Sequence, residues 1–327
     1  MVAQRHRVPE RLHRQGPLFK TGQVQQALKP YAQFTSITST CCFENLGQGT
    51  YNALLISLNR EMRSGLHYLV SYTWQKNLTD ADSAVPGNNA GVQGIQDPTN
   101  LRGEKALSVQ DVPQTLVLSY LYDLPFGRNR RFFATSPKIV NSIISGWELS
   151  GIQRYQSGVP FSFSCASSIP GTSTCSRFSF TGASIWSSAK ISGKLNPLSG
   201  STANPATNSM FNGAVGGSAT ASVQTNPAFY DQNYVTYRGT GAYSYGNVPR
   251  VTSKVRLNSF FNEDFSLIKS TTIRDEVKFI LQVQALNAFN RHAWATPGLD
   301  PNGQQFGVPT DTIVKPRQLQ ITARVSF

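Results

Sequence analysis

The last eleven residues, Arg317 to Phe327, alternate apolar and polar side chains without a break and end on an aromatic ring. Leu319, Ile321, Ala323, Val325 and Phe327 fall on one face of the predicted strand, and the intervening residues are all hydrophilic. A strand with one apolar and one hydrophilic face fits a boundary between lipid and water. On this segment alone, an amphipathic strand of a soluble sandwich is the favoured interpretation, and the rest of the chain must decide between the two.

The same alternation recurs upstream and predicts about eight strands, most of them long for a soluble domain. Besides the last strand, the predicted segments are Tyr31–Ser39, Tyr51–Arg60, Gly65–Asn77, Pro113–Leu124, Gly146–Phe163, Lys254–Lys269 and Asp275–Phe289. Two irregularities stand out, at Gln153 and around Asn262 to Asp264. The side chains predicted to face lipid are Leu116, Leu118, Tyr120, Phe279, Leu281, Val283, Leu319, Ile321 and Val325.

The connections between these strands alternate in length as well. Turns of short or moderate length are expected at Glu61–Ser64, Pro125–Ser145 and Ser270–Arg274, and long polar loops at Leu78–Val112, Ser164–Ser253 and Asn290–Pro316, with Cys41–Gln48 as a shorter member. All long loops therefore lie at one end of the strands and all turns at the other. An antiparallel up-and-down transmembrane β-barrel has this layout, with its long loops outside the cell.

Aromatic residues are predicted at both ends of the strands. Tyr72 and Trp74 lie near the long-loop end of their strand, whereas Tyr122 and Trp147 lie near the turn end of theirs. Two levels of amphipathic rings are typical of a barrel that meets two headgroup layers. We therefore interpret these four residues as interfacial aromatics.

Composition and charge narrow the class of protein. The chain of 327 residues has no run of about 18 apolar residues, so no transmembrane helix is expected. The formal net charge of +13 suggests nucleic-acid binding, but the cations form no single stripe and accompany no nucleic-acid-binding motif. We expect no nucleic-acid partner.

Candidate chemistry is sparse. The sequence contains no zinc-protease motif, nucleophile elbow, phosphate loop or dinucleotide fingerprint, so we expect neither an enzyme nor a cofactor or metal site. Cys165 and Cys175 lie in one Ser/Gly/Pro-rich segment, and they could form a loop disulfide or remain two free thiols. The basic head, residues 1–29, lacks the apolar segment of a secretion signal and is expected to be disordered.

Several segments together resemble a known family. PYAQFTSITS, GTYNALLISLNREMRSGLHYLVSYTWQKNLTDADS, QDVPQTLVLSYLYDLPFGRNRRFF, ISGWELSGIQRYQSGVPFSF, NSFFNEDFSLIK, FILQVQALNAFN and QLQITARVSF resemble the barrel of TonB-dependent receptors, in particular the Oar-like branch, which carries a carboxypeptidase-regulatory-like domain. The resemblance covers Pro30 to Phe327. It implies that the barrel-assembly machinery reads the terminal aromatic Phe327 as an assembly signal.

The resemblance also implies a location and a function. We expect residues 30–327 to be the C-terminal part of an outer-membrane barrel that takes up a large or scarce solute with energy from the inner membrane. The family's signal peptide, regulatory-like domain, TonB box and plug have no counterpart here, so contact with the TonB complex would depend on the missing plug region. Two alternatives stay open: a complete small barrel acting as adhesin or passive pore, and a secreted β-sandwich that binds glycans.

Overall fold

A computed structural model of the chain describes its strands and much of its loops. The described residues are 47–81, 95–97, 100–128, 130–164, 176–186, 209–211, 228–230, 244–274, 277–301, 305–309 and 311–327. The expected strand Tyr31–Ser39 and the head, residues 1–29, lie outside this part of the chain.

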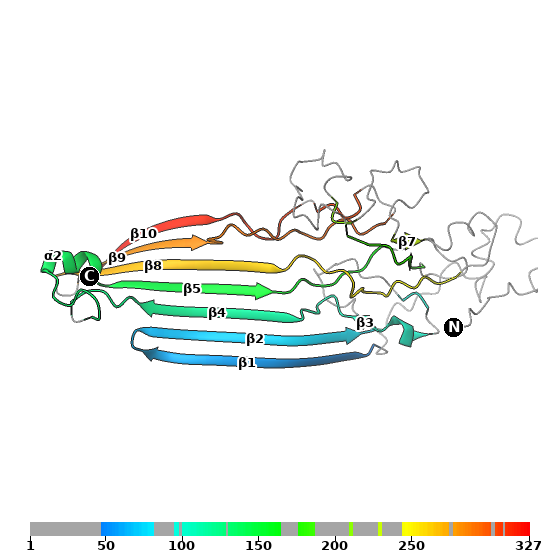
Figure 1. Ribbon diagram of the computed structural model, residues 1–327, viewed down its shortest axis with the longest axis horizontal. Helices are drawn as coiled ribbons and strands as arrows, with labels where there is room; N and C mark the ends of the chain where they lie inside the picture. Colours follow the sequence, from blue (N-terminus) through cyan, green and yellow to red (C-terminus); the bar gives the residue numbers. More distant parts are fainter. Residues whose placement is uncertain are drawn as a thin grey trace, which may run out of the picture.

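One antiparallel sheet dominates the described structure (Figure 1). It contains eight strands, seven of which follow one another as neighbours in chain order, while the eighth, β3 (Ala106–Leu107), pairs only with β2. The seven neighbours are β1 (Gly49–Arg63), β2 (Leu66–Thr79), β4 (Gln114–Asp123), β5 (Trp147–Gln156), β8 (Phe260–Arg274), β9 (Val277–Leu286) and β10 (Gln318–Ser326). This up-and-down order confirms the all-β antiparallel fold predicted from the alternation.

The register joins the apolar positions of all seven strands into one surface. Across β8, β9 and β10, Leu267 is paired with Val283, and Val283 with Ile321. Across β1, β2 and β4, Ile56 is paired with Tyr72, and Tyr72 with Leu116. Because paired residues of neighbouring strands point to the same side, these residues define an "apolar face", and the alternate residues define a "hydrophilic face".

The turns and the long loops are segregated to opposite ends of the sheet (Figure 1). At one end, Ser64 and Gly65 form a two-residue turn between β1 and β2 in which both residues have positive φ, 55° and 79°. Positive φ at both positions is the type I′ geometry that matches strand twist. The C-terminus lies at this same end, together with the connection that contains helix α2 (Lys138–Ile144).

Several strand boundaries differ from the sequence-based expectation. The expected turn Glu61–Ser64 is too long, because Glu61 to Arg63 still belong to β1. The expected turn Ser270–Arg274 is wrong, because these residues continue β8, where Thr271 pairs with Phe279. Serine and threonine are common in turns, but threonine is also β-branched and favours strands. Strand β8 begins only at Phe260, and β5 ends at Gln156, so the outer parts of Lys254–Lys269 and Gly146–Phe163 are not regular strand.

The buried hydrophobic core lies mainly in the loops and reaches the adjoining end of the sheet, where it includes Ala106 and Leu107 of β3. Phe161, Phe163, Phe211, Phe229 and Phe306 pack together in it, with the rings of Phe163 and Phe229 4.5 Å apart between centroids. The short strands β6 (Ser179–Phe180) and β7 (Phe229–Tyr230) pair within the same region. We call this packed region, contributed by all three long loops, the "loop layer". The sequence predicted long polar loops but gave no indication of the hydrophobic core that they contain.

Within the described residues the sheet is open. Strands β1 and β10 form its two edges and have one pairing partner each. Both edge strands run from the loop layer toward the turn end, so they are parallel to each other. An all-antiparallel barrel closes only with an even number of strands. The seven long strands therefore form a section of a wall rather than a closed barrel.

Candidate functional site

Every side chain predicted to face lipid lies on the apolar face. Leu116, Leu118, Tyr120, Phe279, Leu281, Val283, Leu319, Ile321 and Val325 all lie on it according to the register. No second layer of sheet covers them in the described structure, and Leu319 and Ile321 remain 70% and 72% exposed. A solvent-exposed apolar surface of this extent marks a site of contact with membrane or protein. Their contact with lipid stays a prediction.

The four predicted interfacial aromatics share this face at two levels. Tyr72 and Trp74 lie in the part of β2 nearer the loop layer, and Trp74 is 57% exposed. Tyr122 and Trp147 lie at the turn end of β4 and β5. The indole nitrogen of Trp147 donates a hydrogen bond of 2.9 Å to the carbonyl of Ile143 in helix α2. Trp147 therefore links the apolar face to the connection beyond it.

The hydrophilic face contains a hollow of about 390 Å³. Its lining comes from five neighbouring strands and includes His67, Ser119, Ser150, Asp264 and Gln284. The hollow spans five neighbouring strands of the sheet and is lined mainly by hydrophilic side chains, as expected of the inside of a barrel.

The two irregularities in the sequence pattern meet at one place on the apolar face. Gln153 of β5 and Glu263 of β8 are directly paired, and both are buried. The amide of Gln153 donates to the hydroxyl of Tyr120 over 3.3 Å, and the guanidinium of Arg291 lies 3.4 Å from the carboxylate of Glu263. The sequence showed each interruption separately, but only the register of β5 with β8 brings them together.

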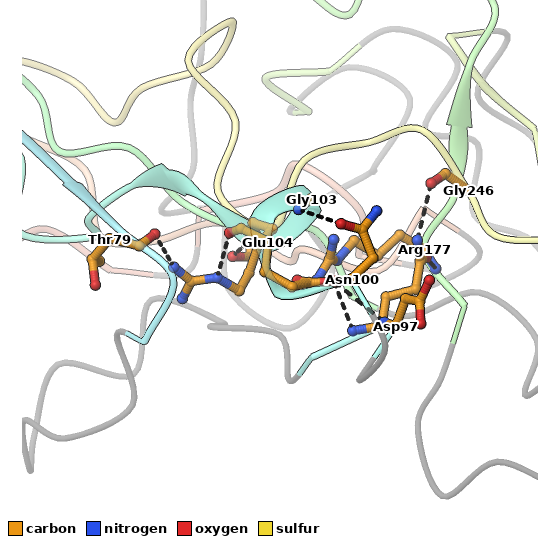
Figure 2. A network of polar contacts seen from close by, with 10 residues as sticks. Thr79, Asp97, Asn100, Gly103, Glu104, Arg177 and Gly246 are labelled. Atoms are coloured by element: carbon orange, nitrogen blue, oxygen red, sulfur yellow. Dashed lines mark hydrogen bonds and ion pairs between the residues drawn. The ribbon is translucent and has the colours of Figure 1, made fainter. Parts of the chain in front are cut away.

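Buried polar residues fix the loop layer to the end of β2 (Figure 2). Glu104, at the end of the short 3-10 helix Leu101–Glu104, forms an ion pair with Arg177, and both side chains are buried. Its carboxylate also accepts a hydrogen bond of 3.0 Å from the backbone N–H of Gln96. Arg250 donates to the carbonyl of Thr79 over 2.6 Å and to that of Glu104 over 3.3 Å. These bonds join two different loops to one strand end.

Two further contacts strengthen the same junction. The guanidinium of Arg256 lies 2.6 Å from the carboxylate of Asp111, whose other oxygen accepts a hydrogen bond of 2.7 Å from the backbone N–H of Asn77. Beside the Glu104 network, burial and the neighbouring Asp97 carboxylate raise the pKa of the Tyr245 hydroxyl. Because the sequence of the loops has no periodicity, none of these partners could be predicted from it.

A cavity of about 820 Å³ lies where the loop layer meets β1 and β2. Leu54, Trp74 and Leu78 line it from β1 and β2, Leu107 lines it from β3, and Val251 lines it from a loop. Polar groups also reach it, among them Lys76, Asp111 and Arg256. Leu54 and Trp74 belong to the apolar face and are half exposed, so this cavity is open on the side predicted to contact lipid.

The described structure does not test some of the predicted features. Cys165 and Cys175 lie outside the described residues. Within the described part of the chain, no group of three or more His, Cys, Asp or Glu side chains is placed to hold a metal ion. Among the same residues, no helix is both long and apolar enough to cross a membrane.

Comparison with protein families agrees with the geometry. A model of the outer membrane beta barrel domain matches residues 4–320, so the chain belongs to this family of membrane proteins. The protein is therefore located in the outer membrane. No curated protein matches the chain. The alternative of a secreted β-sandwich is wrong, since a sandwich would bury the apolar face against a second sheet.

The orientation of the barrel can be tested from outside the cell. We expect an epitope tag inserted between Gly182 and Ala183, exposed residues of the loop layer, to bind antibody on intact cells. A tag at Ser64, in the turn between β1 and β2, should bind only after the outer membrane is opened. The reverse pattern of labelling would place the long loops on the periplasmic side.

Proposed function

We propose that the protein forms part of the β-barrel of a TonB-dependent receptor, as its resemblance to the Oar-like branch implies, and serves energised uptake of a large or scarce solute. The observation that carries this proposal is the loop layer. Its aromatic core and its buried ion pair between Glu104 and Arg177 give the loops a defined shape at the mouth of the wall. Binding residues are commonly held on loops that a rigid scaffold positions.

The sheet can form part of a large barrel. The two edge strands, β1 and β10, run in the same direction, so further strands are needed for antiparallel closure. Barrels of about 22 strands have a lumen wide enough to hold a plug, whereas barrels of about eight strands are filled by their own side chains. The hydrophilic face suits a water-filled lumen. This role needs no catalytic group, and we propose that the protein is not an enzyme.

Solute uptake by intact cells tests this function. A strain without the gene and its parent are grown in a medium that contains siderophores, vitamins and oligosaccharides, with and without a protonophore. We expect at least one solute to be depleted only by the parent, and the protonophore to stop this depletion. Uptake that continues with the protonophore would indicate a passive pore, and a defect in adhesion alone would indicate an adhesin.

We also propose that the barrel-assembly machinery is a partner of this protein. Phe327 follows the last residue of β10, lies at the turn end of the sheet and is 97% exposed. An aromatic ring that fills no core is available to a receptor. We expect deletion of Phe327 to lower the yield of inserted protein, while Leu319→Val, which keeps the apolar face, leaves the yield unchanged. Heat-modifiable migration of membrane fractions measures insertion, and undiminished insertion after the deletion would refute the role.

A further inference from the structure

The connection between β4 and β5 has a chemical composition unlike that of the other turns. Residues Pro125 to Ser145, here called the "basic connection", contain Arg128, Arg130, Arg131 and Lys138 and no Asp or Glu. All four cations are exposed to solvent. The connection itself therefore carries one sign of charge. It lies at the turn end of the sheet (Figure 1).

The same surface exposes large apolar side chains. In helix α2, Ile139, Val140 and Ile143 are 79%, 44% and 65% exposed, and their spacing places them along one side of the helix. Phe132 and Phe133 are also exposed, and both rings approach Phe126. Leaving five such side chains in water is unfavourable, so this surface is suited to a partner that removes them from water.

The basic connection is held at the edge of the apolar face. The bond from Trp147 to the carbonyl of Ile143 ties helix α2 to the first residue of β5, and the amine of Lys269 donates to the carbonyl of Ser145. Inside the connection, the side chain of Asn141 accepts a hydrogen bond from the backbone N–H of Arg128. These contacts fix the helix where the membrane-spanning strands β4 and β5 end.

We propose that the basic connection binds anionic phospholipid in the membrane leaflet at the turn end, with Ile139, Val140 and Ile143 among the acyl chains. The charge of the basic connection favours anionic phospholipid as the partner, because its four cations, without a carboxylate among them, complement phosphate headgroups. The position of helix α2 also supports a lipid partner, because the helix adjoins the apolar face through Trp147. Cations combined with exposed apolar residues on a short helix are typical of segments that lie in a membrane interface.

Native mass spectrometry of the full chain, folded in detergent and titrated with phosphatidylglycerol or phosphatidylcholine, tests the proposal. We expect Arg130→Gln/Arg131→Gln to weaken phosphatidylglycerol binding by roughly twenty-five-fold, since each cation near a lipid surface contributes about five-fold, and to leave phosphatidylcholine binding unchanged. Lys278→Gln/Arg324→Gln is the matched control, because it removes two exposed cations from other strands. It should change neither affinity.

A photo-reactive residue identifies the partner inside cells. Benzoylphenylalanine in place of Ile139, in the full chain, should cross-link to phospholipid, whereas a protein adduct or no adduct would overturn the proposal. Equal loss of phosphatidylglycerol binding in both double variants would also overturn it, because general positive charge would then explain the affinity. Heat-modifiable migration shows that each variant is folded before it is compared. None of these results depends on transport by the barrel.

Discussion

Arginine in place of Val283 should lower the free energy of unfolding in a bilayer by about 2–4 kcal/mol. Val283 lies in the middle of β9 on the apolar face, between Leu267 and Ile321 of the neighbouring strands. A charge at this position would have to enter hydrocarbon or distort the lipid around it. Leu281 is a less suitable position, because its partner Lys269 would add repulsion between two cations. Urea titration of the protein in phospholipid vesicles measures the effect.

The neighbouring positions supply the control for this experiment. Gln282 and Gln284 lie on the hydrophilic face and line its hollow. Gln284→Arg should therefore cost little, and Gln282→Arg should cost about 1 kcal/mol, because it loses a hydrogen bond of 2.9 Å to the hydroxyl of Ser266. Equal losses at positions 283 and 284 would show that the two faces do not meet different solvents, and would refute the predicted lipid contacts.

The alternation of side chains predicted the sheet well because one physical rule controls it. Residues in strand β10 point alternately to two sides, and the pattern from Leu319 to Val325 assigns them without reference to any other part of the chain. The same rule failed at Ser270–Arg274, where polar residues near the end of β8 gave no signal that distinguishes a strand from a turn. Helix α2 was also missed, although Pro137 before it and the spacing of Ile139, Val140 and Ile143 are typical of a helix start.

The candidate site was less predictable, because it depends on contacts between distant segments. Gln153 and Glu263 appeared as two separate faults in the pattern, and their pairing follows from the register of β5 with β8. In the loop layer, Glu104 and Arg177 come from loops that have no periodic pattern, so their partners are set by tertiary packing alone. A single sequence gives the faces of strands but not the register between distant strands or the partners of charges in loops.

Removing the carboxylate of Glu104 should destabilise the loop layer by about 3–5 kcal/mol while leaving the strands inserted. Glu104 is 2% exposed and its ion pair with Arg177 is buried, so Glu104→Ala removes a buried counter-charge of this cation. The same substitution removes the acceptor of the backbone N–H of Gln96. We expect faster hydrogen exchange and faster proteolysis in residues 100–111 and 176–180, with unchanged heat-modifiable migration.

Lys105→Ala provides the matched control for Glu104→Ala, because it removes a charge from the next residue. Lys105 is exposed, and its amine lies 3.5 Å from the hydroxyl of Thr50, so its contribution to the free energy of unfolding should be below about 1 kcal/mol. A second variant, Glu104→Gln, keeps the volume and one acceptor oxygen but loses the charge. Its hydrogen-exchange rates in the loops should lie between those of Glu104→Ala and Lys105→Ala. If Glu104→Ala and Lys105→Ala gave the same exchange rates in the loops, the buried ion pair would not be what holds the loop layer to β2.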